Sequence, residues 1–221
     1  MAFVIDKLSL AMSIAEAVSE KLLQINAIKL SPQKPFTWAS GLRSPIYCDN
    51  RIVLSHPEIR SFIIDQFVEL AKTMPPFDVV AGVATAGIPH GALLADRLNV
   101  PFVYVRSKAK AHGRQNQIEG KLEKGQKALV IEDLISTGGS CLQAVECLRE
   151  AGAEVVGVLA IFTYSFDKAS QAFDSANCRM ATLSNYEALI QQATAQSYIT
   201  SDQQSTLESW RKDPKAWSEQ H

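Results

Sequence analysis

The sequence predicts an α/β fold in which a central parallel sheet is flanked by helices on both faces. From residue 77 onward, apolar runs of strand length alternate with segments of helical period. These runs are almost continuously apolar, which is typical of parallel strands that are covered on both faces. With 221 residues, 47% of them hydrophobic, the chain is long enough for one main domain with an appendage.

The main unit is expected to alternate between strands and helices. The strands are expected at residues 79–83, 101–106, 128–131, 154–162 and 179–183. The helices are expected at residues 57–73, 88–98 and 140–151. Ser55 and Glu58 have the spacing of a capping box, with Pro57 at the first helical position. The polar stretch from residue 185 is compatible with a helical tail anchored by Leu207, Trp210 and Trp217.

The N-terminal part differs in pattern from the rest of the chain. Residues 7–25 have the apolar spacing of an amphipathic helix, whereas prolines and a glycine interrupt residues 27–54. We therefore expect an N-terminal helix and hood over residues 1–54, followed by a core over residues 55–221. Within that core, residues 107–126 have no strong period, which is typical of a mobile loop or lid.

The charge balance and the N-terminus limit the classes of partner. The 22 Lys and Arg against 23 Asp and Glu give a net charge of −1, so we expect no nucleic-acid partner. No apolar run approaches the roughly 18 residues of a membrane span, and we expect no membrane association. Asp6 and Lys7 stand where a signal peptide would be apolar, which favours a cytoplasmic location.

The cysteine and histidine positions favour free thiols over a disulfide framework or a zinc site. Cysteines 48, 141, 147 and 178 form no Cys-x-x-Cys pair. Histidines 56, 90, 112 and 221 are scattered, and none stands at metal-ligand spacing from another or from a cysteine.

The strongest functional signal covers residues 130–140, where a buried strand leads into two acids, a glycine loop and a helix. The segment continues from its strand as Glu132, Asp133, Leu134, Ile135, Ser136, Thr137, Gly138, Gly139 and Ser140. Ligands bind at the carboxyl ends of parallel strands, and a glycine-rich helix start presents backbone N–H groups to an anion. The pattern predicts a phosphate cradle; the alternative is an ordinary strand-to-helix turn with Asp133 as a cap.

The two acids indicate what accompanies the phosphate. A carboxylate beside a phosphate is a poor phosphate ligand, so Glu132 and Asp133 more plausibly accept hydrogen bonds from sugar hydroxyls. The pattern therefore favours a phosphorylated sugar. Other nucleotide motifs are missing, because the chain has no G-x-G-x-x-G and Gly120-Lys121 lacks the rest of a Walker A loop.

This segment resembles the 5-phosphoribosyl-1-pyrophosphate (PRPP) signature of type I phosphoribosyltransferases: an apolar strand, two acids, two apolar residues and Ser-Thr-Gly-Gly-Ser. Residues 104–120 are similar to the mobile catalytic loop of the orotate phosphoribosyltransferase family. Residues 36–51 are similar to that family's N-terminal signature, and residues 85–89 to its first core loop. The chain departs from the usual pattern at Ser107, at Ala86 and at residues 162–164, which contain no arginine.

The resemblance implies a pentosyltransferase. It would transfer ribose 5-phosphate from PRPP to orotate, giving orotidine 5-phosphate and diphosphate, in de novo pyrimidine (UMP) biosynthesis. It also implies Mg²⁺, held mainly by diphosphate and ribose oxygens, and we assign the ion no protein ligand. A homodimer with shared active sites is implied as well, in which the loop of one subunit covers the site of the other.

The resemblance also implies roles for individual residues. The catalytic residues would be Arg106, Lys110, His112 and Asp133. The residues that bind PRPP would be Arg106, Lys110, His112, Glu132, Asp133, Leu134, Ile135, Ser136, Thr137, Gly138, Gly139 and Ser140. The residues that bind orotate would be Ser136, Phe36 and Lys29. Lys29 could equally be an exposed lysine after a helix, and Phe36 could be part of the core of the hood.

The loop has the composition that this reaction needs. Arg106, Lys108, Lys110 and Arg114, with His112 among them, provide positive charge without an acid. Such donors stabilise the charge that develops on a departing diphosphate, and a closing lid excludes water from the reactive ribosyl centre. His112 or Lys110 could also donate a proton to the leaving oxygen. The alternative is a solvated basic loop.

Two rival functions make different demands on the sequence. A purine phosphoribosyltransferase would share the PRPP signature but not residues 40–51 or the pairing of Lys110 with His112. A non-enzymatic PRPP-sensing regulator would keep the cradle and add a basic nucleic-acid surface. Neither the balanced charge nor the cationic loop favours such a regulator.

Replacing Lys110 by alanine should lower kcat roughly ten- to a thousandfold, because a preorganised cation acts mainly when the leaving group gains charge. Steady-state kinetics with both substrates varied will measure this effect. A higher KM with an unchanged kcat would show instead that Lys110 contributes only to substrate binding.

Overall fold

The computed structural model describes residues 13–38, 40–107 and 117–221. Its centre is a six-stranded sheet in the order β10-β9-β8-β5-β6-β7. The strands are β5 (Val79–Val83), β6 (Phe102–Val105), β7 (Ile118–Glu119), β8 (Lys127–Ile135), β9 (Glu154–Thr163) and β10 (Met180–Asn185). All neighbouring strands run parallel except β6 and β7. The predicted α/β fold with a parallel sheet is therefore confirmed.

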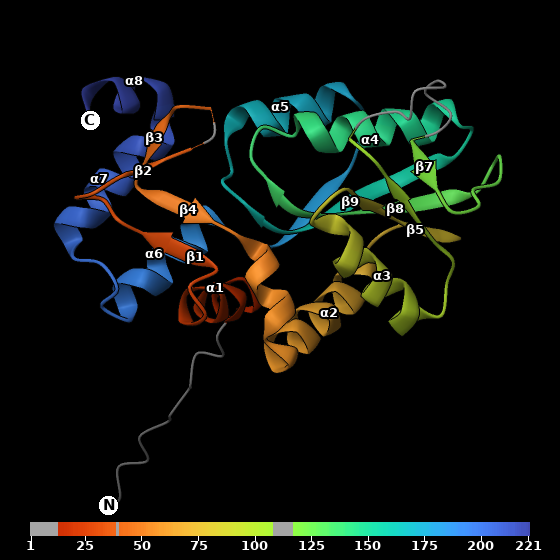
Figure 1. Ribbon diagram of the computed structural model, residues 1–221, viewed down its shortest axis with the longest axis horizontal. Coiled ribbons are helices and arrows are strands. Elements are labelled where there is room, and N and C mark those ends of the chain that lie inside the picture. Colours follow the sequence, from red (N-terminus) through yellow and green to blue (C-terminus); the bar gives the residue numbers. More distant parts are fainter. Residues whose placement is uncertain (1–12, 39, 108–116) are drawn as a thin grey trace, which may run out of the picture.

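Both faces of the sheet are buried, as the continuous apolar strands predict. Along β5, Val79 and Ala81 belong to one hydrophobic cluster and Val80 to the other. Helices α4 (Gly139–Glu150) and α5 (Asp167–Ser175) cover one face, and α2 (Pro57–Ala71) and α3 (Gly87–Leu98) cover the other (Figure 1). Helix α3 approaches β8 closely, since a Cβ on Gly87 would collide with the carbonyl oxygen of Ile131.

Two local expectations need correction. Ser55 does not cap α2, because it ends the 3-10 helix η1 (Asn50–Ser55) and His56 is the N-cap, without a side-chain cap bond. Residues 107–126 contain a short strand, β7, which pairs with β6. Helix α5 between β9 and β10 was also not among the expected elements; its sequence is mostly polar, and only Ala169 and Phe173 are buried.

Helix α1 (Ile14–Gln24) begins with a capping box, whereas the sequence pattern predicts one at Ser55 and Glu58. Ser13 Oγ accepts a hydrogen bond from the backbone N–H of Glu16, and the Glu16 side chain accepts one from the N–H of Ser13. The helix packs against β10 and α6 (Tyr186–Ala195). Residues 7–12 of the expected helix lie outside the described residues.

The hood and the C-terminal segment lie together on one side of the sheet (Figure 1). The hood pairs β1 (Ile28–Leu30) with β4 (Ile46–Cys48), and β2 (Phe36–Thr37) with β3 (Arg43–Ser44). The C-terminal segment consists of α7 (Ser201–Lys212) and α8 (Pro214–Gln220). The backbone N–H of Arg43 donates a hydrogen bond of 2.8 Å to Ser218 Oγ, so helix α8 is attached to the hood.

The four cysteines are free: Cys141 and Cys178 are buried, whereas Cys48 and Cys147 are partly exposed. Within the described ranges, no group of three or more His, Cys, Asp and Glu side chains is placed to hold a metal ion. No helix in those ranges is long and apolar enough to cross a membrane.

Candidate active site

Three cavities lie in a row where β5, β8 and β9 end. The acid cavity, of about 320 Å³, is lined by Cys48, Asp49, Arg51, Ala84, Thr85, Ala86, Glu132, Asp133, Leu134 and Ser140. The aromatic cavity, of about 390 Å³, is lined by Thr37, Trp38, Tyr47, Cys48, Leu134, Ser136 and Tyr164. The tail cavity, of about 690 Å³, lies between the hood, the start of α5 and residues 211–215. Shared lining residues connect the acid cavity to the aromatic cavity and the aromatic cavity to the tail cavity.

Strand β8 continues to Ile135, four residues further than expected, and places both acids inside the strand. Glu132 is 6% exposed and Asp133 is half-buried. The backbone N–H of Asp133 donates a hydrogen bond of 2.9 Å to Glu132 Oε1. Neither acid is a helix cap, because Gly138 is the N-cap of α4. The alternative of an ordinary cap at Asp133 is therefore wrong.

Burial raises the pKa values of both acids. Burial and the neighbouring Asp133 carboxylate raise the pKa of Glu132 well above its ordinary value. Burial also raises the pKa of Asp133, although the charge of Arg51 opposes this shift. The pair is thus poorly satisfied without a ligand, and hydroxyl donors or added positive charge beside it would stabilise its ionised form.

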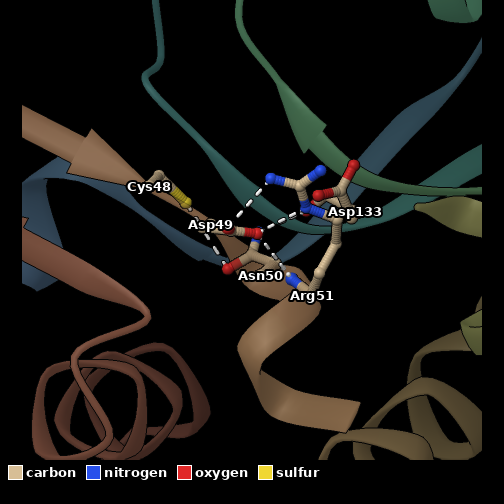
Figure 2. Close-up of polar contacts among 5 residues, drawn as sticks. All are labelled: Cys48, Asp49, Asn50, Arg51 and Asp133. Atoms are coloured by element: carbon tan, nitrogen blue, oxygen red, sulfur yellow. Dashed lines mark hydrogen bonds and ion pairs between the residues drawn. The ribbon is translucent and has the colours of Figure 1, made fainter. Parts of the chain in front are cut away.

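Three residues after β4 hold the acid cavity together (Figure 2). Asn50 Nδ2 donates a hydrogen bond of 2.8 Å to the carbonyl oxygen of Asp133, which ties the hood to β8. Arg51 donates to both carboxylate oxygens of Asp49, at 2.6 and 2.9 Å. These charge-assisted bonds lower the pKa of Asp49, so this acid stays ionised beside the raised pair.

The loop after β8 has the geometry of an anion cradle. Gly138 has φ +82, a left-handed conformation that favours glycine, and a Cβ there would meet the Phe173 ring at 2.9 Å. Gly139 begins α4, so its N–H belongs to the first turn, where backbone donors have no carbonyl partner within the helix. A Cβ on Gly139 would meet nothing within 4 Å. The loop is therefore open to a ligand at Gly139 and packed against protein at Gly138.

The end of β9 braces this loop from the side. Thr163 Oγ1 donates a hydrogen bond of 3.1 Å to the carbonyl oxygen of Ile135 and accepts one of 3.0 Å from the N–H of Ser165. The start of the loop is thus fixed to the neighbouring strand.

The structure brings most of the expected site residues together. Residues 132–140 form the floor of the acid cavity and the cradle beside it, and Thr85 and Ala86 face them from the end of β5. Arg106 follows β6, and its guanidinium lies 3.5 Å from Glu119 Oε1. The backbone N–H of Arg106 donates a hydrogen bond of 2.9 Å to the carbonyl oxygen of Gln117, which closes the base of the loop. Lys110 and His112, with Lys108 and Arg114, lie outside the described residues.

The two expected orotate contacts in the hood occupy different positions. Phe36 is half-buried, and its ring centroid lies 5.7 Å from that of Tyr47, a lining residue of the aromatic cavity. Lys29 is exposed on β1, opposite Tyr47 in the register, and lines none of the three cavities. Their roles in binding stay predictions.

Sequence reasoning missed the residues that shape the aromatic cavity. Trp38, Tyr47 and Cys48 lie inside the hood motif at residues 36–51, but nothing in the order of residues shows which side chains face the core. Tyr164 directly follows β9 and reaches the same cavity. The available signal was its place at the carboxyl end of a parallel strand beside β8.

Comparison with known proteins agrees with this geometry. Residues 57–196 match the family model of the phosphoribosyl transferase domain. The chain is 56% identical over 207 residues to an orotate phosphoribosyltransferase of Listeria innocua, covering 93% of this chain and 99% of that protein. An orotate phosphoribosyltransferase of Cytophaga hutchinsonii is 54% identical over the same shares of the two chains.

Solved structures show the same fold. The crystal structure of an orotate phosphoribosyltransferase from Aeropyrum pernix has a TM-score of 0.72 at 28% identity, covering 83% of this chain and 99% of that one. A UMP synthase of Leishmania donovani has a TM-score of 0.78 at 27% identity, covering 90% of this chain and 42% of that one. The fold and the cradle after β8 define a type I phosphoribosyltransferase. Within that class, the chain belongs to the orotate phosphoribosyltransferase family.

Replacing Gly139 by valine should abolish PRPP binding and leave the protein folded, because the side chain would occupy the open side of the cradle. The matched change Gly138→Val should instead destabilise the fold, since it meets Phe173 and strains a positive φ. Titration calorimetry with PRPP and Mg²⁺, combined with thermal unfolding, will separate the two effects. Near-normal PRPP affinity in folded Gly139→Val would remove the loop from the site.

Replacing Glu132 by glutamine should stabilise the ligand-free protein and lower kcat. A carboxyl whose folded pKa is raised opposes folding as the pH rises above the ordinary glutamate value of about 4.3. Removing a carboxyl that ionises readily only in the unfolded chain should add roughly 1–2 kcal/mol to the free energy of unfolding at pH 8 and less at pH 5. Denaturant unfolding at both pH values will test this, with the exposed Glu146→Gln as control. Lower stability with unchanged turnover would make Glu132 purely structural.

Proposed function

We propose that this protein transfers ribose 5-phosphate from PRPP to orotate, releasing diphosphate and forming orotidine 5-phosphate for pyrimidine biosynthesis. The observation that supports this best is a pair of adjacent acids, one buried and one half-buried, beside an anion cradle and an aromatic cavity. A phosphorylated sugar and a flat base require these three environments side by side.

The parts of the two substrates fit separate regions of the site. The 5-phosphate would bind the N–H groups at the start of α4, and the ribose hydroxyls would donate to Glu132 and Asp133. The base would enter the aromatic cavity, where Ser136 offers a hydrogen bond. The diphosphate would lie toward Thr85 and Ala86, within reach of the loop that begins after Arg106.

The reaction joins orotate N1 to ribose C1 as the bond from C1 to the diphosphate oxygen breaks. The bonding pair leaves with the diphosphate, and the proton lost from N1 balances the proton that the departing diphosphate takes up. The ribosyl centre becomes cationic, and the carboxylates of Glu132 and Asp133 would stabilise that charge beside it. Arg106, Lys110 and His112 would take up the charge that develops on the diphosphate, while the closed loop excludes water.

The acid cavity fits a substrate that carries Mg²⁺. Added positive charge would ease the mutual repulsion of Glu132 and Asp133, and their oxygens are hard ligands of the kind this ion accepts. Mg²⁺, when bound, would neutralise charge on the diphosphate. We assign the ion to diphosphate and ribose oxygens, with these acids nearby and no direct protein ligand.

Purified protein with orotate, PRPP and Mg²⁺ should consume orotate, which is followed by the loss of its absorbance, and should release one diphosphate per orotate. Adenine and hypoxanthine should not replace orotate. Turnover of a purine without turnover of orotate would establish the rival purine phosphoribosyltransferase and overturn the substrate assignment.

A homodimer with shared sites is also part of the proposal. If the loop of one subunit covers the site of its partner, mixing Lys110→Ala with Gly139→Val should restore part of the activity through hybrids with one intact site. The recovered activity should approach one quarter of the wild-type value at equal mixing, since half the dimers are hybrids and each has one of two sites. No recovery after demonstrated subunit exchange would assign each loop to its own subunit.

A further inference from the structure

Tyr164 is more fully buried than the other lining residues of the aromatic cavity. Its ring centroid lies 5.5 Å from that of Trp38 on one side and 5.5 Å from that of Phe166, which stacks on it, on another. Trp210 of α7 and Phe162 of β9 meet the ring edge-on, with centroids 5.7 and 5.6 Å away. The side chain is only 2% exposed, so its phenol has a fixed direction.

The backbone of Tyr164 is fixed as well. Its N–H donates a hydrogen bond of 3.3 Å to the carbonyl oxygen of Ile135, next to the start of the cradle. Arg211 of α7 donates to the carbonyl oxygens of Tyr164 and Ser165, at 3.4 and 3.0 Å. The C-terminal segment thus braces this wall of the cavity from behind.

The hydroxyl of Tyr164 is not used by the protein itself. It forms no hydrogen bond with any residue of the described ranges, and it is not among the buried polar atoms that lack a partner there, so the oxygen is accessible although the residue is almost fully buried. Tyr186, which is equally buried, donates its hydroxyl to the carbonyl oxygen of Leu207 at 2.9 Å. Because Tyr164 lines the aromatic cavity, an accessible hydroxyl that the protein does not use is available to a partner that enters the cavity.

The surroundings of the phenol keep it protonated. Burial is the main cause that raises the pKa of Tyr164 well above its ordinary value. Cys48 lines both the aromatic and the acid cavity, and Asp133 lines the acid cavity. The phenol therefore remains a protonated donor at neutral pH, on a side chain that lines the cavity proposed for the base.

We propose that the Tyr164 hydroxyl donates a hydrogen bond to an exocyclic carbonyl oxygen of the pyrimidine base and is a specificity-determining residue for that base. This inference rests on the proposed transfer to orotate. A rigid donor suits the purpose, because little side-chain entropy is lost when the base binds and the geometry rewards only a base with an acceptor at that place.

The test compares Tyr164→Phe with Tyr186→Phe. Each change removes one hydroxyl and keeps the ring, but only Tyr164 lines the aromatic cavity, whereas the Tyr186 hydroxyl is bonded to Leu207. In Tyr164→Phe the KM for orotate should rise roughly five- to fiftyfold, as expected when a buried acceptor on the ligand loses its donor, and the KM for PRPP should change less than about twofold. The melting temperature should stay at the wild-type value or rise. Tyr186→Phe should lower the melting temperature and leave both KM values unchanged.

Each outcome assigns the result to one cause. Wild-type turnover of orotate is measured first, and its absence would overturn the proposed function and this inference with it. If the wild type turns over and Tyr164→Phe has the wild-type KM for orotate, the proposed function holds and the role of Tyr164 is refuted. An equal rise in both KM values, or the same change in Tyr186→Phe, would also refute it, because general loosening rather than base recognition would be the cause.

Discussion

The parallel register of β8 with β5 and β9 is the constraint on which the rest of the structure depends. Because all three strands run the same way, their carboxyl ends open on one edge, where the acids, the cradle and Tyr164 gather. Because β8 is covered on both faces, the Glu132 side chain lies in a site that is largely shielded from solvent. A strand exposed on one face would hydrate that acid and lose the electrostatic advantage of a low dielectric.

Ionising the two acids of this site is unfavourable in the ligand-free protein, and a bound substrate would reduce that cost. Glu132 is buried and the adjacent Asp133 is half-buried, and both have raised pKa values, while the ionised Asp49 nearby is paired with Arg51. In the function proposed above, ribose hydroxyls and a cationic centre would stabilise the carboxylates of this pair. Stability is given up where the chemistry needs charge, which is a common compromise at active sites.

Much of the fold could be predicted, because period and burial are local properties of sequence. Alternation of apolar runs predicted the sheet, and two acids before Ser-Thr-Gly-Gly-Ser predicted the cradle. Helix α5 could not be predicted because only Ala169 and Phe173 are buried, and two residues are too few to show a helical period. The cap of α2 was misplaced because Ser55 belongs to a 3-10 turn that tertiary packing imposes. Tyr164 and Arg211 could not be paired from sequence, since 47 residues separate them.

The contact between Arg43 and Ser218 affects the order in which parts of the protein fold during synthesis. The hood is synthesised early, yet its partner in α8 follows 175 residues later. Domains fold as synthesis proceeds, and contacts between distant parts of the chain form last. The sheet and its cradle can assemble while the C-terminal segment is still being made. The aromatic wall around Tyr164, which includes Trp210 of α7, is finished only after α7 has been made, so the cradle would form in a nascent chain before that wall.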